Sequence, residues 1–215
     1  MRRLIDLSHD VEHGMITYKG LPAPIICDFL TRKASKAKYA ADTTFQMGKI
    51  EMVSNTGTYV DAPFHRYEQG KDLSELALDS LADLEGVVFH AQKQANGPEL
   101  FAGADVKGKA VLVHTGWARH WRTDQYFEGH PHLTESAALW LREQKAAFVG
   151  IDSLNIDGTT TGARPVHTVL LGADIPICEH MCNLEQLPDS GFRLHAAPVK
   201  VKGFGTFPVR AYAIT

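Results

Sequence analysis

The stretch SNTGTYVDAPFHR, residues 54–66, combines a Gly-Thr turn with an aspartate, a proline and a histidine in close succession. The glycine permits a tight turn, and the proline stiffens the chain. The preceding run, TTFQMGKIEMV at 43–53, alternates well enough to predict a strand. Side chains that follow the end of a strand often bind ligands in α/β proteins. Asp61 and His65 are therefore the first candidates for a metal or catalytic site.

Outward from this stretch, strand-like and helix-like segments alternate along the chain. The segments 73–86 and 134–147 carry apolar residues at helical spacing, and Thr134 is of a type that caps a helix N-terminus. Strands are expected at 2–9, 43–53, 87–91, 109–118, 148–153, 192–203 and 208–215, with a short helix and then a strand within 167–180. The pattern predicts an α/β fold with more strand than helix. No long linker divides residues 1–215, so we expect a single domain.

The composition narrows the choice of partner and compartment. A formal net charge of -3 indicates neither a nucleic-acid surface nor an anionic membrane partner. The densest basic run, at 32–38, lacks interleaved aromatic residues and is typical of a solvated loop or helix face. No apolar run approaches the roughly 20 residues of a membrane span. Three cysteines are too few for a disulfide framework, so we expect a cytoplasmic protein with reduced thiols.

Several stretches together resemble one known family, the cyclase-like metal-dependent hydrolases, which include bacterial kynurenine formamidase and isatin hydrolase. The family motif His-x-Gly-Thr-His-x-Asp-x-Pro-x-His is similar to NTGTYVDAPFH at 55–65. The other similar stretches are IDLSH at 5–9, VLVHTGW at 111–117, VGIDSLNID at 149–157, PVHTVLLGADIPICEHMCNLEQL at 165–187 and GFGTFPVRAYAI at 203–214. The resemblance spans nearly the whole chain and implies the family's single-domain swivelling β/β/α fold.

The resemblance also implies a set of metal ligands. In the family, two metal ions are held by two motif histidines, the motif aspartate and a later His and Glu twelve residues apart. Asp61, His167 and Glu179 match the last three of these positions. Asn55 and Tyr59 stand where the two motif histidines stand, so one metal position lacks its imidazoles.

Ligand chemistry gives the consequence of this departure. An amide oxygen is a weak neutral ligand, and a phenol binds metal well only after losing a proton whose usual pKa is about 10. Asp61, His167 and Glu179 still offer two carboxylates and one imidazole, a mixture that suits zinc or manganese. We therefore expect one divalent ion, with the Asn55 and Tyr59 position empty or weak.

The remaining roles follow from the resemblance. It implies that His65 is the general acid/base, and that Tyr59 donates a hydrogen bond to the oxyanion while Asn55 orients water or substrate. Tyr18 is a candidate for stacking on the substrate, and His9 is a candidate for the pocket wall.

Two functions remain open at this level. The first is a metal-dependent hydrolase that cleaves an amide, lactam or related acyl bond of a small cyclic or aromatic molecule. The second is a degenerate member of the same fold that binds a small ligand without turning it over, an interpretation that the two missing histidines favour. By analogy with the family, the expected assembly is a homodimer or homotetramer.

Overall fold

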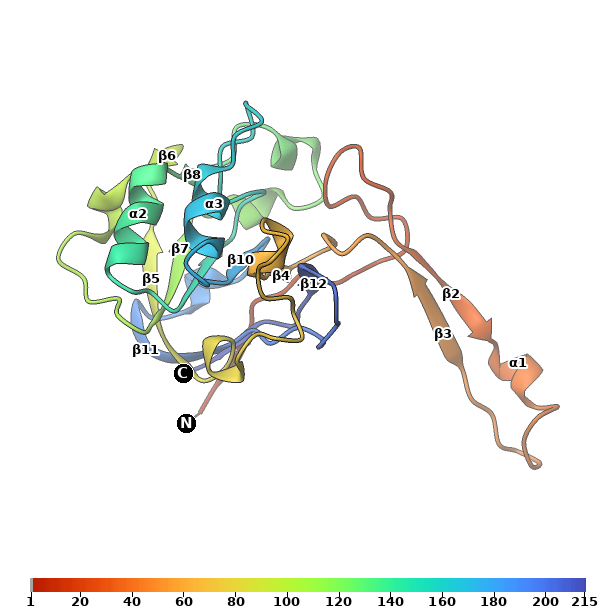
Figure 1. The fold of residues 1–215 in the computed structure, drawn as a ribbon. Coiled ribbons are helices and arrows are strands. Elements are labelled where there is room, and N and C mark those ends of the chain that lie inside the picture. The colour runs from red at the N-terminus through yellow and green to blue at the C-terminus, as the bar shows by residue number, and fades with distance from the viewer. Residues whose placement is uncertain (1) are drawn as a thin grey trace.

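Residues 2–215 are described by the computed structural model of the chain, which is built around one curled nine-stranded sheet (Figure 1). The strand order is β1, β13, β11, β5, β7, β9, β10, β4 and β12. The strands of this sheet are β1 (Leu4–Asp6), β4 (Tyr59–Asp61), β5 (Leu84–His90), β7 (Ala110–His114), β9 (Phe148–Ile151), β10 (Ile177–Glu179), β11 (Ser190–His195), β12 (Thr206–Pro208) and β13 (Tyr212–Ile214).

The centre of the sheet is parallel, with β5, β7, β9 and β10 running in the same direction. Antiparallel strands extend it on both sides, β4 and β12 beyond β10, and β11, β13 and β1 beyond β5. Parallel strands are buried on both faces and need a continuous apolar run. β7 shows this clearly, because Val111 and Leu112 are both fully buried yet belong to core clusters on opposite faces.

Two α-helices, α2 and α3, cover one face of this sheet (Figure 1). The α-helices of the described chain are α1 (Arg32–Ser35), α2 (Glu135–Glu143) and α3 (Pro165–Leu171). α2 and α3 lie side by side against the sheet, and their apolar residues share one core cluster with β7 and β9 (Figure 1). Thr134 caps α2 as predicted, since its hydroxyl accepts a hydrogen bond from the backbone N–H of Ala137 at 3.3 Å. The expected strand-rich α/β fold with few helices is confirmed.

Short 3₁₀ helices connect the larger elements. They are Pro63–His65, Leu78–Ser80, Pro98–Phe101, Trp117–His120, Asp124–Phe127 and Leu184–Gln186. Within residues 2–215, no helix is both long enough and apolar enough to cross a membrane.

The helix expected at 73–86 is not formed. The segment makes turns and one 3₁₀ turn, and β5 already begins at Leu84. Its leucines do not share one helix face, because Leu73 and Leu81 are buried whereas Leu78 is largely exposed. The backbone N–H of Leu73 instead donates to the carbonyl of Phe204 at 3.0 Å. A tertiary contact therefore overrides the local helical spacing.

Two small sheets lie apart from the main one. β6 (Ala95–Asn96) pairs with β8 (His132–Leu133), and β2 (Ile25–Leu30) pairs with β3 (Met47–Glu51). The β2–β3 hairpin carries α1 near its far end and projects away from the body of the molecule (Figure 1). The predicted strand at 43–53 thus belongs to this projecting hairpin and not to the central sheet.

Candidate functional site

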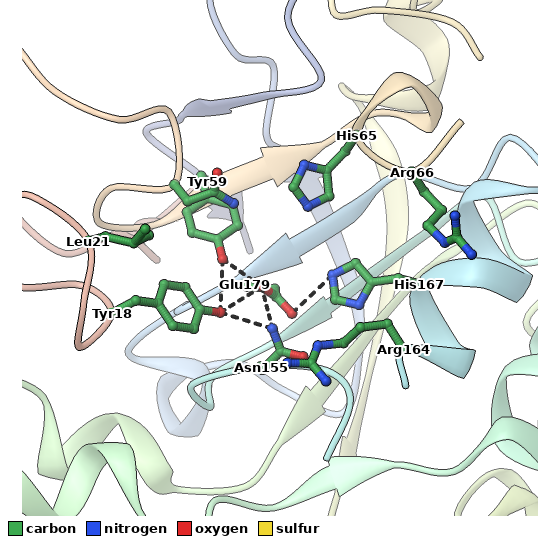
Figure 2. A pocket seen from close by; sticks show the side chains of 10 residues that line it. Tyr18, Leu21, Tyr59, His65, Arg66, Asn155, Arg164, His167 and Glu179 are labelled. Atoms are coloured by element: carbon green, nitrogen blue, oxygen red, sulfur yellow. Dashed lines mark hydrogen bonds and ion pairs between the residues drawn. The ribbon is translucent and has the colours of Figure 1, made fainter. Parts of the chain in front are cut away.

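A cavity of about 330 Å³ opens at the end of the sheet where β4 and β10 lie side by side. It is lined by Tyr18, Leu21, Asn55, Tyr59, His65, Arg66, Asn155, Arg164, His167 and Glu179. Figure 2 shows their side chains converging from several segments of the chain. Six residues that the sequence singled out therefore meet in one place: Tyr18, Asn55, Tyr59, His65, His167 and Glu179.

Strand register brings the buried part of this group together. β4 pairs with β10 so that Tyr59 lies opposite Glu179, and it pairs with β12 so that Asp61 lies opposite Thr206. Side chains two residues apart on a strand share a face, so Tyr59 and Asp61 point to the same side. The hydroxyl of Thr206 donates a hydrogen bond to Asp61 Oδ1. Asp61 is fully buried, and its second oxygen, Oδ2, has no hydrogen-bond partner in the structure.

His167 is oriented by a buried aspartate that the sequence analysis did not single out. Asp157 accepts hydrogen bonds from the backbone N–H groups of Val166 at 2.8 Å and His167 at 3.0 Å, at the start of α3. The same carboxylate lies 2.7 Å from His167 Nδ1. With Nδ1–H donated to Asp157, Nε2 is the ring nitrogen that faces the cavity, and its lone pair can bind a metal once its proton has left.

The second ring nitrogen of His167, Nε2, lies between two carboxylates. Nε2 is 3.6 Å from Glu179 Oε1 (Figure 2). It is also 3.6 Å from Asp61 Oδ2, so the predicted trio of ligands lies together. A second group is formed by Asp61, His65 and His167, whose potential ligand atoms all lie within 4.8 Å of one another. Asp61 and His167 are common to both groups, and His65 and Glu179 flank them.

The electrostatics of this cluster favour a cation. Burial alone lowers the pKa of His167, but the carboxylates of Glu179, Asp157 and Asp61 outweigh it and raise that pKa to about 10. Burial also raises the pKa of Glu179, and the charge of His167 opposes this shift. The buried carboxylates thus keep a proton on His167, and its positive charge partly balances theirs. A divalent ion would supply the same positive charge. Asp61 Oδ2, which has no hydrogen-bond partner in the structure, is available as a ligand atom, so these residues fit a metal.

His65 has a defined tautomer. Its Nδ1 is 2.9 Å from the hydroxyl oxygen of Thr206, whose single hydrogen is already donated to Asp61 Oδ1. The hydroxyl must therefore accept from Nδ1–H of His65, so in the neutral imidazole Nε2 is the nitrogen without a proton. Gly205 makes this approach possible, because a Cβ atom there would collide with the backbone of His65. His65 is thus prepared to accept a proton.

Tyr59 binds the second oxygen of the Glu179 carboxylate, and Tyr18 lies beside it. The phenol of Tyr59 donates to Glu179 Oε2 at 2.7 Å (Figure 2). The phenol of Tyr18 donates to the carbonyl of Leu154 at 2.6 Å. Asn155 donates to the Tyr18 oxygen at 2.9 Å. Burial, followed by the charge of Glu179, raises the pKa of both phenols well above its usual value. Tyr59 is therefore a neutral phenol whose hydrogen is donated to Glu179.

His9 is not among the residues that line this cavity. Its ring stacks on Trp121 with ring centroids 4.1 Å apart and planes 4° apart. Its backbone N–H donates to Thr58 at 2.9 Å. These two contacts fix His9 in a neighbouring aromatic cluster.

Five polar or charged residues of the site were missed by the sequence analysis. Asn155, Asp157 and Thr206 complete the hydrogen bonding, and Arg66 and Arg164 line the cavity. Three of them lie in stretches similar to the family, at 149–157 and 203–214, and Arg66 follows His65 directly. Their partners are distant in sequence, so no local spacing connects them.

A buried cluster of carboxylates and imidazoles beneath an open cavity defines a candidate metal-dependent enzyme site on a strand-rich α/β fold. Residues 5–158 match the family model described as "Putative cyclase". The chain therefore belongs to this cyclase family, as the sequence stretches predicted.

Known relatives cover almost the full length of the chain. It is 24% identical over 208 residues to the kynurenine formamidase of Bacillus cereus, covering 96% of this chain and 95% of that protein. It is 28% identical over 174 residues to the kynurenine formamidase of Geobacillus thermodenitrificans, covering 80% and 81%.

Solved structures share the fold over the whole chain. A potential metal-dependent hydrolase with cyclase activity superposes with a TM-score of 0.81 at 25% identity, covering 100% of this chain and 98% of that one. Isatin hydrolase A from Labrenzia aggregata superposes with a TM-score of 0.84 at 22% identity, covering 100% and 94%.

Proposed function

We propose that the chain is a metal-dependent hydrolase that cleaves an amide, lactam or related acyl bond of a small cyclic or aromatic molecule. The observation that carries the proposal is the buried cluster of Asp61, His167 and Glu179 beneath a cavity lined by His65. The kynurenine formamidase relatives and the metal-dependent hydrolase of the same fold support the reaction class.

One divalent ion, zinc or manganese, would be held by Asp61 Oδ2, His167 Nε2 and Glu179. Bound there, it would supply Lewis-acid polarisation of the carbonyl and a lowered pKa for water. The second ion of the family is not expected, because Asn55 offers only an amide and Tyr59 only a neutral phenol.

The side chains of the cavity have separate proposed tasks. His65 accepts a proton from the attacking water at Nε2 and returns it to the leaving nitrogen. Thr206 holds the tautomer of His65 that makes this possible. Tyr59 holds Glu179 in place, since donation to a substrate oxyanion would require its bond to Glu179 to break. Asn55 and Tyr18 remain the proposed contacts to the substrate, and both line the cavity.

We also propose that the protein works in the cytoplasm. The three cysteines that the structure describes, Cys27, Cys178 and Cys182, are all free. Free thiols suit a reducing compartment, where disulfides are rare.

The test combines metal analysis with a substrate screen. Gently purified protein is analysed for zinc and manganese, and is then assayed on N-formyl aromatic amines, isatin-like lactams and lactones. We expect about one ion per chain and metal-dependent turnover in one of these classes. Stoichiometric metal without turnover of any of them, together with saturable binding of an unchanged compound, would instead establish the non-catalytic ligand-binding function.

A further inference from the structure

Two arginines line the cavity of the candidate site without a carboxylate partner. Arg66 and Arg164 lie beside His65 and His167 in the cavity wall (Figure 2). Within residues 2–215, the arginines that form ion pairs are Arg122, Arg142, Arg193 and Arg210. A guanidinium group keeps its charge at every physiological pH. The cavity therefore carries two positive charges that no carboxylate of the described chain contacts.

The side chain of Arg66 is held by α3 and by an aromatic ring. Its Nε–H donates to the hydroxyl of Thr168 at 3.2 Å, and its Cζ lies 5.3 Å from the centroid of the Tyr67 ring. Thr168 in turn donates to the backbone carbonyl of Arg164 at 2.8 Å, so one threonine connects both arginines. The Nη1 and Nη2 groups of Arg66 form no hydrogen bond within the described chain.

Arg164 uses a different part of its guanidinium. Its Nη1 donates to the carbonyls of Thr161 at 2.8 Å and Ala163 at 2.7 Å, which ties it to the loop before α3. Its Nε–H and one N–H of Nη2 point in parallel along the edge that remains. Arg66 keeps the other kind of edge, formed by Nη1 and Nη2. Each arginine thus offers one complete pair of parallel donors, the geometry that binds a carboxylate through two hydrogen bonds.

The charge of the site also favours a carboxylate. Three carboxylates, those of Asp61, Asp157 and Glu179, are buried beneath the cavity. With a divalent ion bound and His167 neutral, two of these negative charges are offset, and the two arginines add two positive charges. One net positive charge is left for the substrate to balance. A single carboxylate does so, whereas a phosphate group carries close to two negative charges.

The position of the arginines indicates which part of the substrate bears this carboxylate. In the proposed reaction His65 returns a proton to the leaving nitrogen, so that nitrogen lies near His65. Arg66 is the next residue of the chain, and Thr168 connects it to Arg164. The carboxylate therefore belongs to the amine part of the substrate. An ammonium group next to it would face two guanidinium groups, so a zwitterionic amino acid is a poorer match than a carboxylate alone.

We propose that Arg66 and Arg164 are specificity-determining residues that bind a carboxylate on the amine part of the substrate. The preferred substrates are then N-acyl derivatives of an amino acid whose carboxylate has no neighbouring ammonium group, of which N-acylaminobenzoates are the aromatic case. This inference rests on the proposed hydrolase function and adds a substrate class to it. The arginines hold the substrate and take no part in breaking the C–N bond.

The test uses protein loaded with Zn²⁺ and pairs of substrates that differ only in charge. The three ring isomers of N-formylaminobenzoate carry the carboxylate, and their methyl esters mask it. For the preferred isomer, kcat/KM should exceed that of its ester by about 100-fold, because each charge-assisted contact contributes roughly tenfold. This ratio should fall roughly tenfold in Arg66→Gln and in Arg164→Gln, and to near one in the double variant. Arg66→Lys should recover only part of the ratio, since lysine keeps the charge but lacks the paired donors.

The matched control is Arg142→Gln/Arg210→Gln, which removes the same charge from two surface ion pairs and should keep the wild-type ratio. Circular dichroism checks the fold of every variant. A second substrate pair, 3-(2-formamidophenyl)propanoate and 2-formamidophenylalanine, differs only by an ammonium group. The wild-type protein should prefer the propanoate.

Equal kcat/KM for acids and esters in the wild-type protein would overturn the inference and leave the hydrolase proposal intact, and this comparison needs no variant to fold. An unchanged ratio in the double variant, or a preference for the ammonium-bearing compound, would also overturn it. If no compound is hydrolysed, the hydrolase proposal fails for this substrate class, and calorimetry with the three aminobenzoates tests the anion site alone. A loss of affinity of at least about tenfold in the double variant supports the site. Full affinity in that variant would show that the metal alone binds the carboxylate and would overturn the inference.

Discussion

Asp157→Asn is the change that most directly tests how the site is held. Asp157 is 1% exposed and accepts three hydrogen bonds, two of them from His167. An asparagine has only one oxygen to offer. If its amide nitrogen faces His167, the imidazole must accept at Nδ1 and carry its proton on Nε2, the atom that should bind metal. If its oxygen faces His167, the backbone N–H of Val166 loses its acceptor.

Either arrangement has a calculable cost. Losing an outer partner of a metal-binding histidine typically weakens metal binding 10- to 100-fold, which is about 1.4 to 2.7 kcal/mol. A buried donor without an acceptor costs about 1 to 3 kcal/mol of folding stability. For a chain of this size, that corresponds to a fall in Tm of about 2 to 4 °C for each kcal/mol.

The assay is competition for Zn²⁺ against a fluorescent chelator, with thermal unfolding of the metal-free protein in parallel. Asp174→Asn is the matched control, because Asp174 lies just beyond α3 and is half exposed in an ion pair with Lys71 at 2.6 Å. A surface pair of this kind contributes at most about 1 kcal/mol. Metal affinity in Asp157→Asn equal to that of Asp174→Asn would refute the argument that Asp157 sets the tautomer of His167.

Four further outcomes are expected. His167→Ala and Glu179→Ala should each lose the metal in elemental analysis, and full occupancy in both would show that the ligand assignment is wrong. His65→Ala should keep the metal and lose about 100- to 10,000-fold in kcat, with Thr206→Val losing less and Thr206→Ser recovering activity; an unchanged kcat in His65→Ala would remove it from the mechanism. Tyr59→Phe should weaken metal binding about tenfold through Glu179; a loss of roughly 10²- to 10³-fold in kcat at full metal content would instead assign Tyr59 to the oxyanion. Metal affinity should rise as the pH rises toward about 10, because below this pKa the metal must displace the proton that His167 holds. Calorimetry in buffers of different ionisation enthalpy should detect the released proton. An affinity independent of pH would contradict this reasoning.

The fold was largely predictable because most of its elements are encoded locally. The apolar run that forms β7 is buried on both faces, and the capping hydroxyl of Thr134 lies at the start of α2, where its sequence pattern predicts it. The leucines between Leu73 and Leu84 are the exception. Their spacing is helical, but a backbone hydrogen bond to Phe204 holds the segment in turns. Local spacing fails where a contact distant in sequence provides the better partner.

The sequence by itself determined which chemical groups are present: Asp61 and His65 on one short turn, and His167 and Glu179 twelve residues apart. The tertiary structure decided how those groups are used. The register of β4 with β12 puts Thr206 opposite Asp61, 145 residues away in the sequence, where its hydroxyl donates to Asp61. The same hydroxyl accepts from Nδ1–H of His65, so Nε2 of the neutral His65 imidazole can accept a proton. Ligand types are properties of single residues, whereas tautomers and shared protons depend on neighbours that only strand pairing and packing bring within hydrogen-bond distance.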